Sequence, residues 1–205
     1  MSLGNDVVDL EDPETHPDAL HIRFDERVFC QAERAALEAS SRPDVVRWTL
    51  WAAKESAYKA TKRLDPALVF SPQKFRVELT SSGRLPWGVK TGRVVHQGNI
   101  CELGVRVSTT CIHAVAVGQG FTLAQVLSRV AETEQDTSAS VRRMAIEHVG
   151  AVLGLGRDDL RIVGRPPLLI HKDHALDATV SLSHHGRFAA FACALSTQRR
   201  VADGE

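Results

Sequence analysis

The segment Trp51-Ala52-Ala53-Lys54-Glu55-Ser56-Ala57-Tyr58-Lys59 decides the fold of this chain. Its periodicity predicts a long helix, capped by Asp44 and running to about Arg63. One face of that helix carries an apolar stripe of mostly small residues, namely Val46, Leu50, Ala53, Ala57, Ala60 and Leu64. Small side chains permit a close approach, so we expect this stripe to pack against a β-sheet.

The opposite face of the helix is mixed in character. It holds Trp48, Trp51, Glu55, Lys59 and Lys62, although a solvated face seldom holds two tryptophans. Glu55 and Lys59 stand at positions i and i+4, the favourable order for an ion pair worth about 0.3–0.5 kcal/mol on a surface. This spacing leaves two interpretations open, an ordinary surface ion pair and a functional pair.

The chain before the central helix predicts a strand, a loop and a shorter helix. Residues 3–10 alternate as a strand does, and the alternation puts Asp6 on the same side as apolar residues. A carboxylate there is costly unless it has a partner such as a metal ion. A proline-containing loop over residues 11–21 and a helix over residues 25–39 should follow.

A strand-rich section follows the central helix. Strands are expected over residues 74–79, 93–96, 100–107 and 112–117, with turns at residues 81–83 and 97–99. After Gly120 the order begins again, with a short helix at 126–131, a linker at 132–138 and a helix from an N-cap at Ser140 to residue 153. Further strands are expected at residues 162–163, 168–170, 179–182 and 188–195, with turns at 164–167 and 183–187.

Both series run from helix to strands and end in a small-residue apolar strand after a histidine. This weak internal repeat predicts an α+β fold built as a pseudo-dimer of two similar halves. The first half would span residues 1–121 and the second residues 122–205, with the active site in the cleft between them.

Composition excludes several classes of partner. The 205 residues are 43% hydrophobic and carry 25 basic and 25 acidic side chains, so bulk electrostatic binding to nucleic acid is not expected. No secretory signal and no apolar run of about 20 residues is present, which favours a cytoplasmic protein without a membrane partner. The four cysteines, Cys30, Cys101, Cys111 and Cys193, lack metal-site spacing and read as reduced, buried thiols.

Three motifs together carry a family resemblance. They are Gly4-Asn5-Asp6-Val7-Val8-Asp9-Leu10, Trp51-x-x-Lys54-Glu55-x-x-x-Lys59 and Ser181-Leu182-Ser183-His184. In combination they resemble the 4′-phosphopantetheinyl transferases, and the Phe29-to-Glu33 segment is similar to one found between the first two motifs of that family. The resemblance covers most of the chain and is least diagnostic over residues 63–120.

The resemblance implies a magnesium-dependent transfer of phosphopantetheine from coenzyme A to a serine of an acyl or peptidyl carrier protein. Adenosine 3′,5′-bisphosphate would be released. It assigns the metal to Asp6 and Glu55, and catalysis to Glu55 and Lys59. It assigns coenzyme A binding to Lys54, Lys59, Arg165, Pro166, Ser183 and His184. Whether Glu55 acts as the base directly or through a bound water stays open.

Further roles follow from the same resemblance. Trp51 would line the site, although a packing role suits it equally well. Arg165 resembles a lysine that lines the adenine end in the family, and Arg142 and Arg143 are weaker candidates for contact with the 3′-phosphate.

Two features depart from the two-half, surfactin-synthetase-activating type of the family. The Ser-His half comes last here, as though the chain were circularly permuted, and the motif order is similar to that of holo-acyl-carrier-protein synthases. Val8 stands where a second acid is usual, and Asp9 points to the other side of the strand, where a structural role is expected. A water would then complete the metal shell, and the protein is expected to be a monomer.

Two other functions remain open from the sequence. Asp6, Glu55, Lys59 and His184 would also suit another metal-dependent enzyme acting on nucleotide phosphates, although no Walker motif is present. A non-catalytic binder of coenzyme A is the second alternative, for which Val8 is the only support. A hydrolase built on Ser183 and His184 is excluded, because adjacent residues seldom act as nucleophile and base.

Overall fold

The computed structural model describes residues 2–80, 88–133 and 137–195, and its strands form antiparallel sheets. The five-stranded sheet has the order β1-β5-β4-β3-β2, with β1 at Leu3–Asp9, β5 at Cys111–Val117, β4 at Asn99–Val107, β3 at Gly88–His96 and β2 at Arg76–Thr80. The second sheet has the order β10-β11-β6, with β10 at Ala178–His185, β11 at Phe188–Leu195 and β6 at Val126–Glu132. A small third sheet contains β7 (Leu160–Val163), β8 (Leu168–His171) and β9 (His174–Ala175).

Four α-helices accompany these strands in the described part of the chain. They are α1 (Phe24–Val28), α2 (Gln31–Glu38), α3 (Pro43–Lys62) and α4 (Thr137–Leu153). Short 3-10 helices lie at Pro13–Thr15, Pro17–Ala19, Pro72–Lys74, Leu123–Gln125 and Arg157–Asp159.

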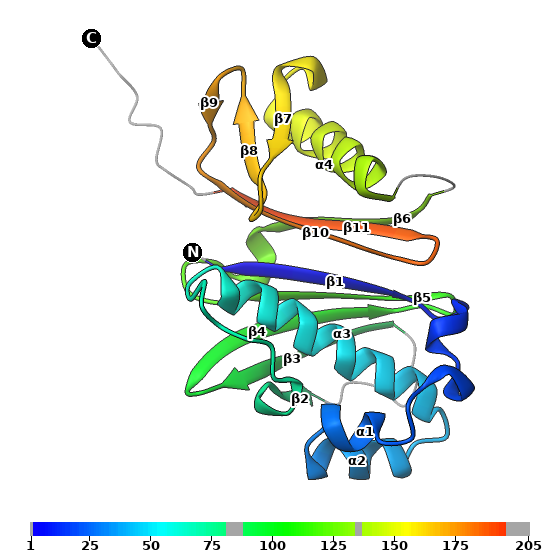
Figure 1. The fold of residues 1–205 in the computed structure, drawn as a ribbon. Coiled ribbons are helices and arrows are strands. Elements are labelled where there is room, and N and C mark those ends of the chain that lie inside the picture. The colour runs from blue at the N-terminus through cyan, green and yellow to red at the C-terminus, as the bar shows by residue number, and fades with distance from the viewer. Residues whose placement is uncertain (1, 81–87, 134–136, 196–205) are drawn as a thin grey trace.

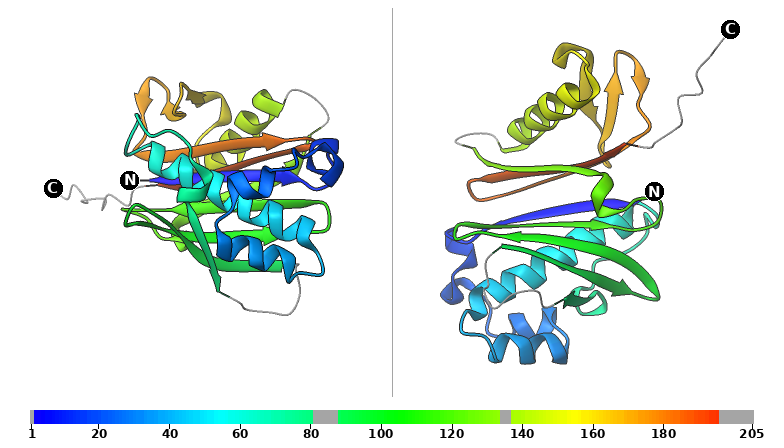
Figure 2. Two further views of the ribbon diagram at one scale, coloured as in Figure 1. Left: turned by 60° about the horizontal axis from the view of Figure 1, so that its bottom comes forward. Right: turned by 180° about the vertical axis from the view of Figure 1, so that it is seen from behind.

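The elements form layers (Figure 1). The helix α3 crosses one face of the five-stranded sheet, and α4 covers the outer face of the second sheet. The two sheets meet where β1 and β5 lie beside β10 and β11, as the view from behind also shows (Figure 2). Apolar clusters seal this junction, one of them shared by Leu3, Val117 and Ala194. An α+β fold is therefore confirmed, while the two-fold relation between similar halves stays a prediction.

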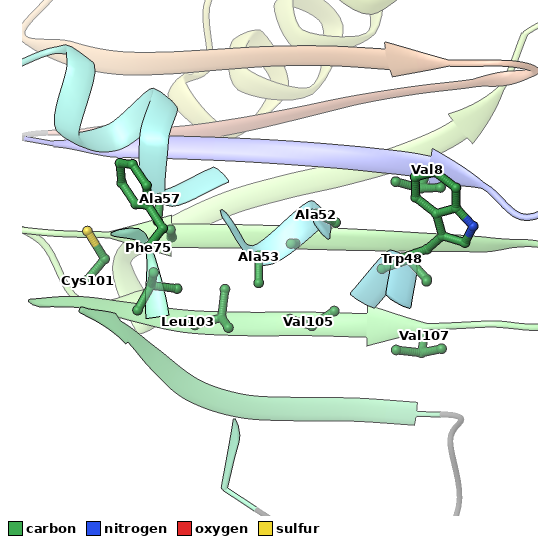
Figure 3. Close-up of a cluster of buried hydrophobic side chains, with 14 of the residues drawn as sticks. Val8, Trp48, Ala52, Ala53, Ala57, Phe75, Cys101, Leu103, Val105 and Val107 are labelled. Atoms are coloured by element: carbon green, nitrogen blue, oxygen red, sulfur yellow. The ribbon is translucent and has the colours of Figure 1, made fainter. Parts of the chain in front are cut away.

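The packing of α3 differs in part from the predicted stripe. Ala53, Ala57 and Ala60 are buried against the sheet as expected, together with Ala52 and Trp48 (Figure 3). The predicted stripe included too few of the buried residues of α3, because α1 and α2 cover the flank of this helix in addition to the sheet that covers one face.

The residues at the two ends of the predicted stripe are not part of the main apolar cluster between α3 and the sheet. Leu50 packs against Phe29 and Leu37 in a second cluster, and Val46 joins it. Leu64 lies beyond the end of α3 and is 52% exposed, so its assignment to the core was wrong.

Glycine at position 4 permits the close contact between α3 and β1. A Cβ at Gly4 would lie 2.0 Å from the Ser56 carbonyl oxygen and 2.7 Å from the Ala60 nitrogen. No rotamer change can relieve a clash with helix backbone, so a larger residue would separate the strand from the helix. This contact brings residue 6, two positions along β1, beside the polar face of α3.

Some predicted helix boundaries were wrong. The helix expected over residues 25–39 is divided into α1 and α2, because the side chain of Glu33 accepts a hydrogen bond from the Cys30 N–H and caps α2 there. Asp44 does not cap α3, since Arg42 occupies the N-cap position and Pro43 is the first helical residue.

The second half contains three more corrections. Residues 126–132 form the strand β6 rather than a helix, because β6 pairs with β11 along its whole length. The helix α4 begins at Thr137, so Ser140 lies inside it rather than at its cap. Ser183, His184 and His185 belong to β10, and the turn to β11 contains only Gly186 and Arg187.

Several other predictions are confirmed. The β3–β4 hairpin turns at Gln97 and Gly98, both of which have positive φ, and strands occupy residues 112–117 and 188–195 as expected. The four cysteines are free thiols, three of them buried and Cys30 half-buried. The turn expected at residues 81–83 lies outside the described residues. Within the described ranges, no helix combines the length and the apolar character that a membrane crossing requires.

Candidate functional site

Lys59 and Asp6 form an ion pair between α3 and β1. The Lys59 Nζ lies 2.7 Å from the Asp6 Oδ1 and also donates to the Asn5 carbonyl oxygen at 3.0 Å. The Asp6 side chain is 13% exposed and that of Lys59 is 31% exposed, so the pair is partly shielded from water. Among the described residues Lys59 pairs with Asp6 and not with Glu55, which excludes the ordinary Glu55–Lys59 surface pair.

Glu55 is a half-buried carboxylate beside this pair. Burial and the nearby Asp6 carboxylate raise the pKa of Glu55 to about 7, against the opposing effect of Lys59. Burial likewise raises the pKa of Asp6, while Lys59 and His185 lower it. Two partly buried acids thus share one lysine, an excess of negative charge that a divalent cation would neutralise.

The residues present therefore suit a magnesium ion. Asp6 and Glu55 offer the hard carboxylate oxygens that Mg²⁺ prefers, and water and substrate phosphate commonly complete its shell. Val8 offers no ligand, since it is buried in the apolar core under α3. Asp9 faces away from α3 and binds Arg187 through both carboxylate oxygens, which fits the structural role expected for it.

A cavity of about 610 Å³ lies between α3, α4, β10 and the β7–β8 turn. We call it the cationic pocket, because it is lined by Lys59, Lys62, Arg63, Arg142, Arg165 and His184. Its other lining residues are uncharged, and no Asp or Glu of the described chain is among them. Such a cavity suits a ligand that carries several phosphates.

The cationic pocket brings together most of the residues predicted to bind the ligand. Lys59, Arg165, Pro166 and His184 all line it, although they come from segments more than a hundred residues apart. Arg142 lines it too, whereas its neighbour Arg143 lines a separate depression.

Ser183 does not line the pocket. Alternation along β10 turns its side chain toward β1, where its Oγ accepts a hydrogen bond from the Asn5 Nδ2 at 3.0 Å. Ser183 is 6% exposed, so in this structure it is not grouped with the residues that line the cationic pocket.

Lys54 also lies away from the cationic pocket. It is fully buried, and its Nζ donates to Glu33 at 2.9 Å and to the carbonyl oxygens of Pro72 and Phe75. All three ammonium hydrogens are thereby used within the protein. Lys54 joins α3 to α2 and to the segment before β2, and has no surface to offer a ligand.

Trp51 likewise packs rather than lining the pocket. Its ring contacts those of Phe24, Trp48 and Phe70 in an aromatic cluster beside α3. The Trp48 indole donates to the Thr15 carbonyl oxygen, which fixes the loop after β1 on this cluster.

Sequence reasoning gave no role at the site to Lys62, Arg63 or Asn5. Lys62 and Arg63 lie three and four residues after Lys59, so they share its helix face, a signal that was available. Arg63 bridges the sheets, because its guanidinium donates to the carbonyl oxygens of Leu3 and Val180. Burial lowers the pKa of Arg63. Asn5 gave no local signal, since its partners are remote in sequence.

Comparison with known proteins adds a family to this geometry. Residues 2–95 match the model of the 4′-phosphopantetheinyl transferase superfamily, a range that includes Asp6, Glu55 and Lys59. The solved structure of Thermotoga maritima holo-[acyl-carrier-protein] synthase is 14% identical over 85% of this chain and 84% of that chain. The TM-score between the two structures is 0.38. No curated protein gives a significant match. This match to the 4′-phosphopantetheinyl transferase superfamily spans a little under half of the chain, from the start of β1 to near the end of β3.

Proposed function

We propose that this protein transfers the 4′-phosphopantetheine group of coenzyme A to a serine hydroxyl of an acyl or peptidyl carrier protein. The observation that carries the proposal is the cationic pocket, which adjoins the acidic pair Asp6 and Glu55 through Lys59. Coenzyme A presents a pyrophosphate and a 3′-phosphate, so a pocket with six basic side chains and no acid matches its charge.

The chain's own residues have separable roles in this reaction. Lys59 would bind the pyrophosphate, and His184 and Arg165 would hold the adenosine end, with Lys62, Arg63 and Arg142 adding positive charge. A magnesium ion held by Asp6 and Glu55 would neutralise charge on the pyrophosphate. The apolar part of the lining, which includes Tyr58 and Leu182, suits the uncharged parts of coenzyme A.

The chemistry is a phosphoryl transfer in which atoms balance. The serine Oγ forms a bond to the pantetheine-side phosphorus, and the bond from that phosphorus to the bridging oxygen breaks. The leaving group is adenosine 3′,5′-bisphosphate, and the hydroxyl proton passes to Glu55 directly or through a water.

The two-half organisation belongs to the same proposal. Residues 1–121 would supply the metal and the catalytic groups, and residues 122–205 most of the adenosine site. Leu3 at the start of β1 shares an apolar cluster with Ala194 near the end of β11, which supports a circular permutation of the two-half enzymes. We expect the protein to act as a monomer in the cytoplasm.

The deciding experiment is the mass of an apo carrier protein after incubation with the protein, coenzyme A and magnesium. The expected result is a gain of one phosphopantetheine group, abolished by a chelator and restored by excess Mg²⁺. The variants Asp6→Ala and Glu55→Ala should remain folded and inactive, while Lys74→Ala, which removes an exposed lysine that does not line the pocket, should remain active.

Other outcomes would identify the alternatives. Tight binding of coenzyme A without transfer to any of several carriers would indicate a non-catalytic binder. Release of phosphate or nucleotide from coenzyme A without a carrier would indicate a hydrolytic phosphate enzyme instead. Full activity of Asp6→Ala under saturating magnesium would exclude Asp6 as a required ligand.

A further inference from the structure

β1 is an edge strand whose open side is occupied by side chains of β10. Its ladder to β5 uses one edge only. On the other edge the Asn5 N–H donates to the Ser181 Oγ at 2.9 Å, and the Asp9 N–H donates to the His185 Nδ1 at 3.1 Å. The two donors on β1 are four residues apart, and so are the two acceptors on β10. The two strands therefore run in the same direction in one fixed register.

The side chain of Asn5 adds a second connection to β10. Asn5 is fully buried, and its Nδ2 donates to the Ser183 Oγ at 3.0 Å and lies 3.3 Å from the His113 Nε2. Burial, aided by Arg106 and Lys59, lowers the pKa of His113 to about 4, so this imidazole is neutral at pH 7 and its Nε2 can accept. The amide thus has acceptors for both of its hydrogens at the junction of the two sheets.

The backbone carbonyl of Asn5 contacts the groups assigned to catalysis. Its carbonyl oxygen accepts a hydrogen bond from the Lys59 Nζ, which also binds Asp6, the next residue along β1. On β10, alternation turns Ser181 and Ser183 toward β1, and His184 lines the cationic pocket. Asn5 is therefore the residue that contacts both the β10 strand of His184 and the Lys59–Asp6 pair.

We infer that Asn5 is a positioning residue that sets the spacing between the Lys59–Asp6 pair and the strand bearing His184. Ser183 acts on coenzyme A only through Asn5, which replaces the direct contact implied by the family resemblance. The inference rests on the proposed function, because the two groups so aligned are those assigned to the pyrophosphate and to the adenosine end.

Loss of this connection should slow transfer more than it weakens binding. A flexible ligand can still reach both groups when the strands shift, but the reacting atoms are then misaligned. Misplacement by about 1 Å can reduce a rate by roughly a hundredfold. We therefore expect Asn5→Ala and Ser183→Ala to lower kcat by about ten- to a hundredfold, with the KM for coenzyme A changed by less than about threefold.

The test is a double-mutant cycle on Asn5→Ala and Ser183→Ala, measured by steady-state kinetics and by denaturant unfolding. The two effects on kcat should not multiply, because either substitution breaks the same hydrogen bond. Ser183→Thr keeps the hydroxyl and should restore most of kcat. Ser108→Ala, which removes hydrogen bonds at the β4–β5 turn, should leave kcat unchanged.

Each outcome decides between the two roles of Ser183. Effects on kcat that multiply, or a large rise in KM for Ser183→Ala with kcat intact, would overturn the positioning role and restore the direct contact. If Asn5→Ala does not fold, the loss in Ser183→Ala and its recovery in Ser183→Thr still decide the question. Wild-type protein that transfers nothing would contradict the proposed function, whereas active wild-type enzyme with a fully active Asn5→Ala would contradict this inference alone.

Discussion

The Nζ of Lys59 lies 2.7 Å from the Oδ1 of Asp6, and this contact ties α3 to β1 beside the cationic pocket. The lysine therefore both pairs with Asp6 and lines the cationic pocket. A pyrophosphate in the pocket would compete with Asp6 for this ammonium, which would leave the Asp6 carboxylate available to a metal. The position of Lys59 links the two halves of the proposed chemistry.

The first prediction separates Lys59 from His184. His184→Ala should mainly weaken coenzyme A binding, by about ten- to a hundredfold, since one lost phosphate contact costs roughly 1.5–3 kcal/mol. Lys59→Ala should also lower kcat, because charge shifts at the pyrophosphate during transfer. Calorimetric titration with coenzyme A and carrier-modification rates measure the two effects. Wild-type affinity in His184→Ala would mean that the adenosine end binds elsewhere.

The second prediction concerns Lys54, whose role is structural in this fold. Lys54→Met leaves the Glu33 carboxylate buried without its cation, so the free energy of unfolding should fall by about 3 kcal/mol. Burial lowers the pKa of Lys54, against the opposing effect of Glu33, so the ammonium depends on its partner to stay charged. Denaturant titration measures the loss, and coenzyme A affinity of the folded variant should be unchanged.

The matched control for Lys54 is the double variant Lys54→Met with Glu33→Gln. Removal of both charges should recover part of the lost stability, because no lone buried charge remains. A variant Lys54→Met with normal stability and weakened coenzyme A binding would instead return Lys54 to the ligand site.

Local patterns in the sequence were sufficient for the parts of the fold that depend on neighbours along the chain. The 3.6-residue repeat identified α3, and alternation with glycine turns identified β1, β5 and the β3–β4 hairpin. The pattern could not show that residues 126–132 form a strand, because pairing with β11, more than fifty residues away, decides it.

The candidate site was predictable only where its residues form a local pattern in the sequence. Asp6, Glu55 and Lys59 carry a recognisable pattern, and the structure places Lys59 against Asp6. The resemblance assigned Lys54 to coenzyme A, since nothing near it in sequence reveals that Glu33 and two carbonyl oxygens enclose it. The contact of Ser183 with Asn5 was not predicted, because residues 183–187 were expected to form a turn and the structure places Ser183 within the strand β10.

The third prediction is a pH dependence of stability from the Asp9–Arg187 pair. Burial alone would raise the pKa of Asp9, but hydrogen bonds from the Arg187 side chain and backbone lower it to about 2. Since the folded-state pKa lies below the ordinary 3.8, the stabilisation is complete above about pH 4 and is lost as the pH falls toward 2. Asp9→Asn should cost about 1–2 kcal/mol at pH 7, the half-exposed Arg187 limiting the gain.

Denaturant midpoints measured at about pH 7 and about pH 2 check this pH dependence. The wild type and Asp9→Asn should differ at the higher pH and converge at the lower one. Asp158→Asn, which removes an exposed carboxylate, should match the wild type at both. A constant difference between wild type and Asp9→Asn would show that packing rather than charge stabilises this position.

The last prediction tests the two-half organisation by rejoining the chain in the other order. Leu3 and Ala194 share an apolar cluster, so a Gly/Ser linker of about ten residues from Leu195 to Ser2 should span the gap. Opening the chain between Phe121 and Thr122 then places the Ser-His half first. The entropic cost of closing a loop changes slowly with its length, so the free energy of unfolding should stay within about 2 kcal/mol of the wild type. Transfer activity should be retained. A control permutant opened at Gly98 divides the β3–β4 hairpin inside the first sheet and should be less stable. Equal stability of the two permutants would argue that the boundary at residues 121 and 122 does not separate two structural units.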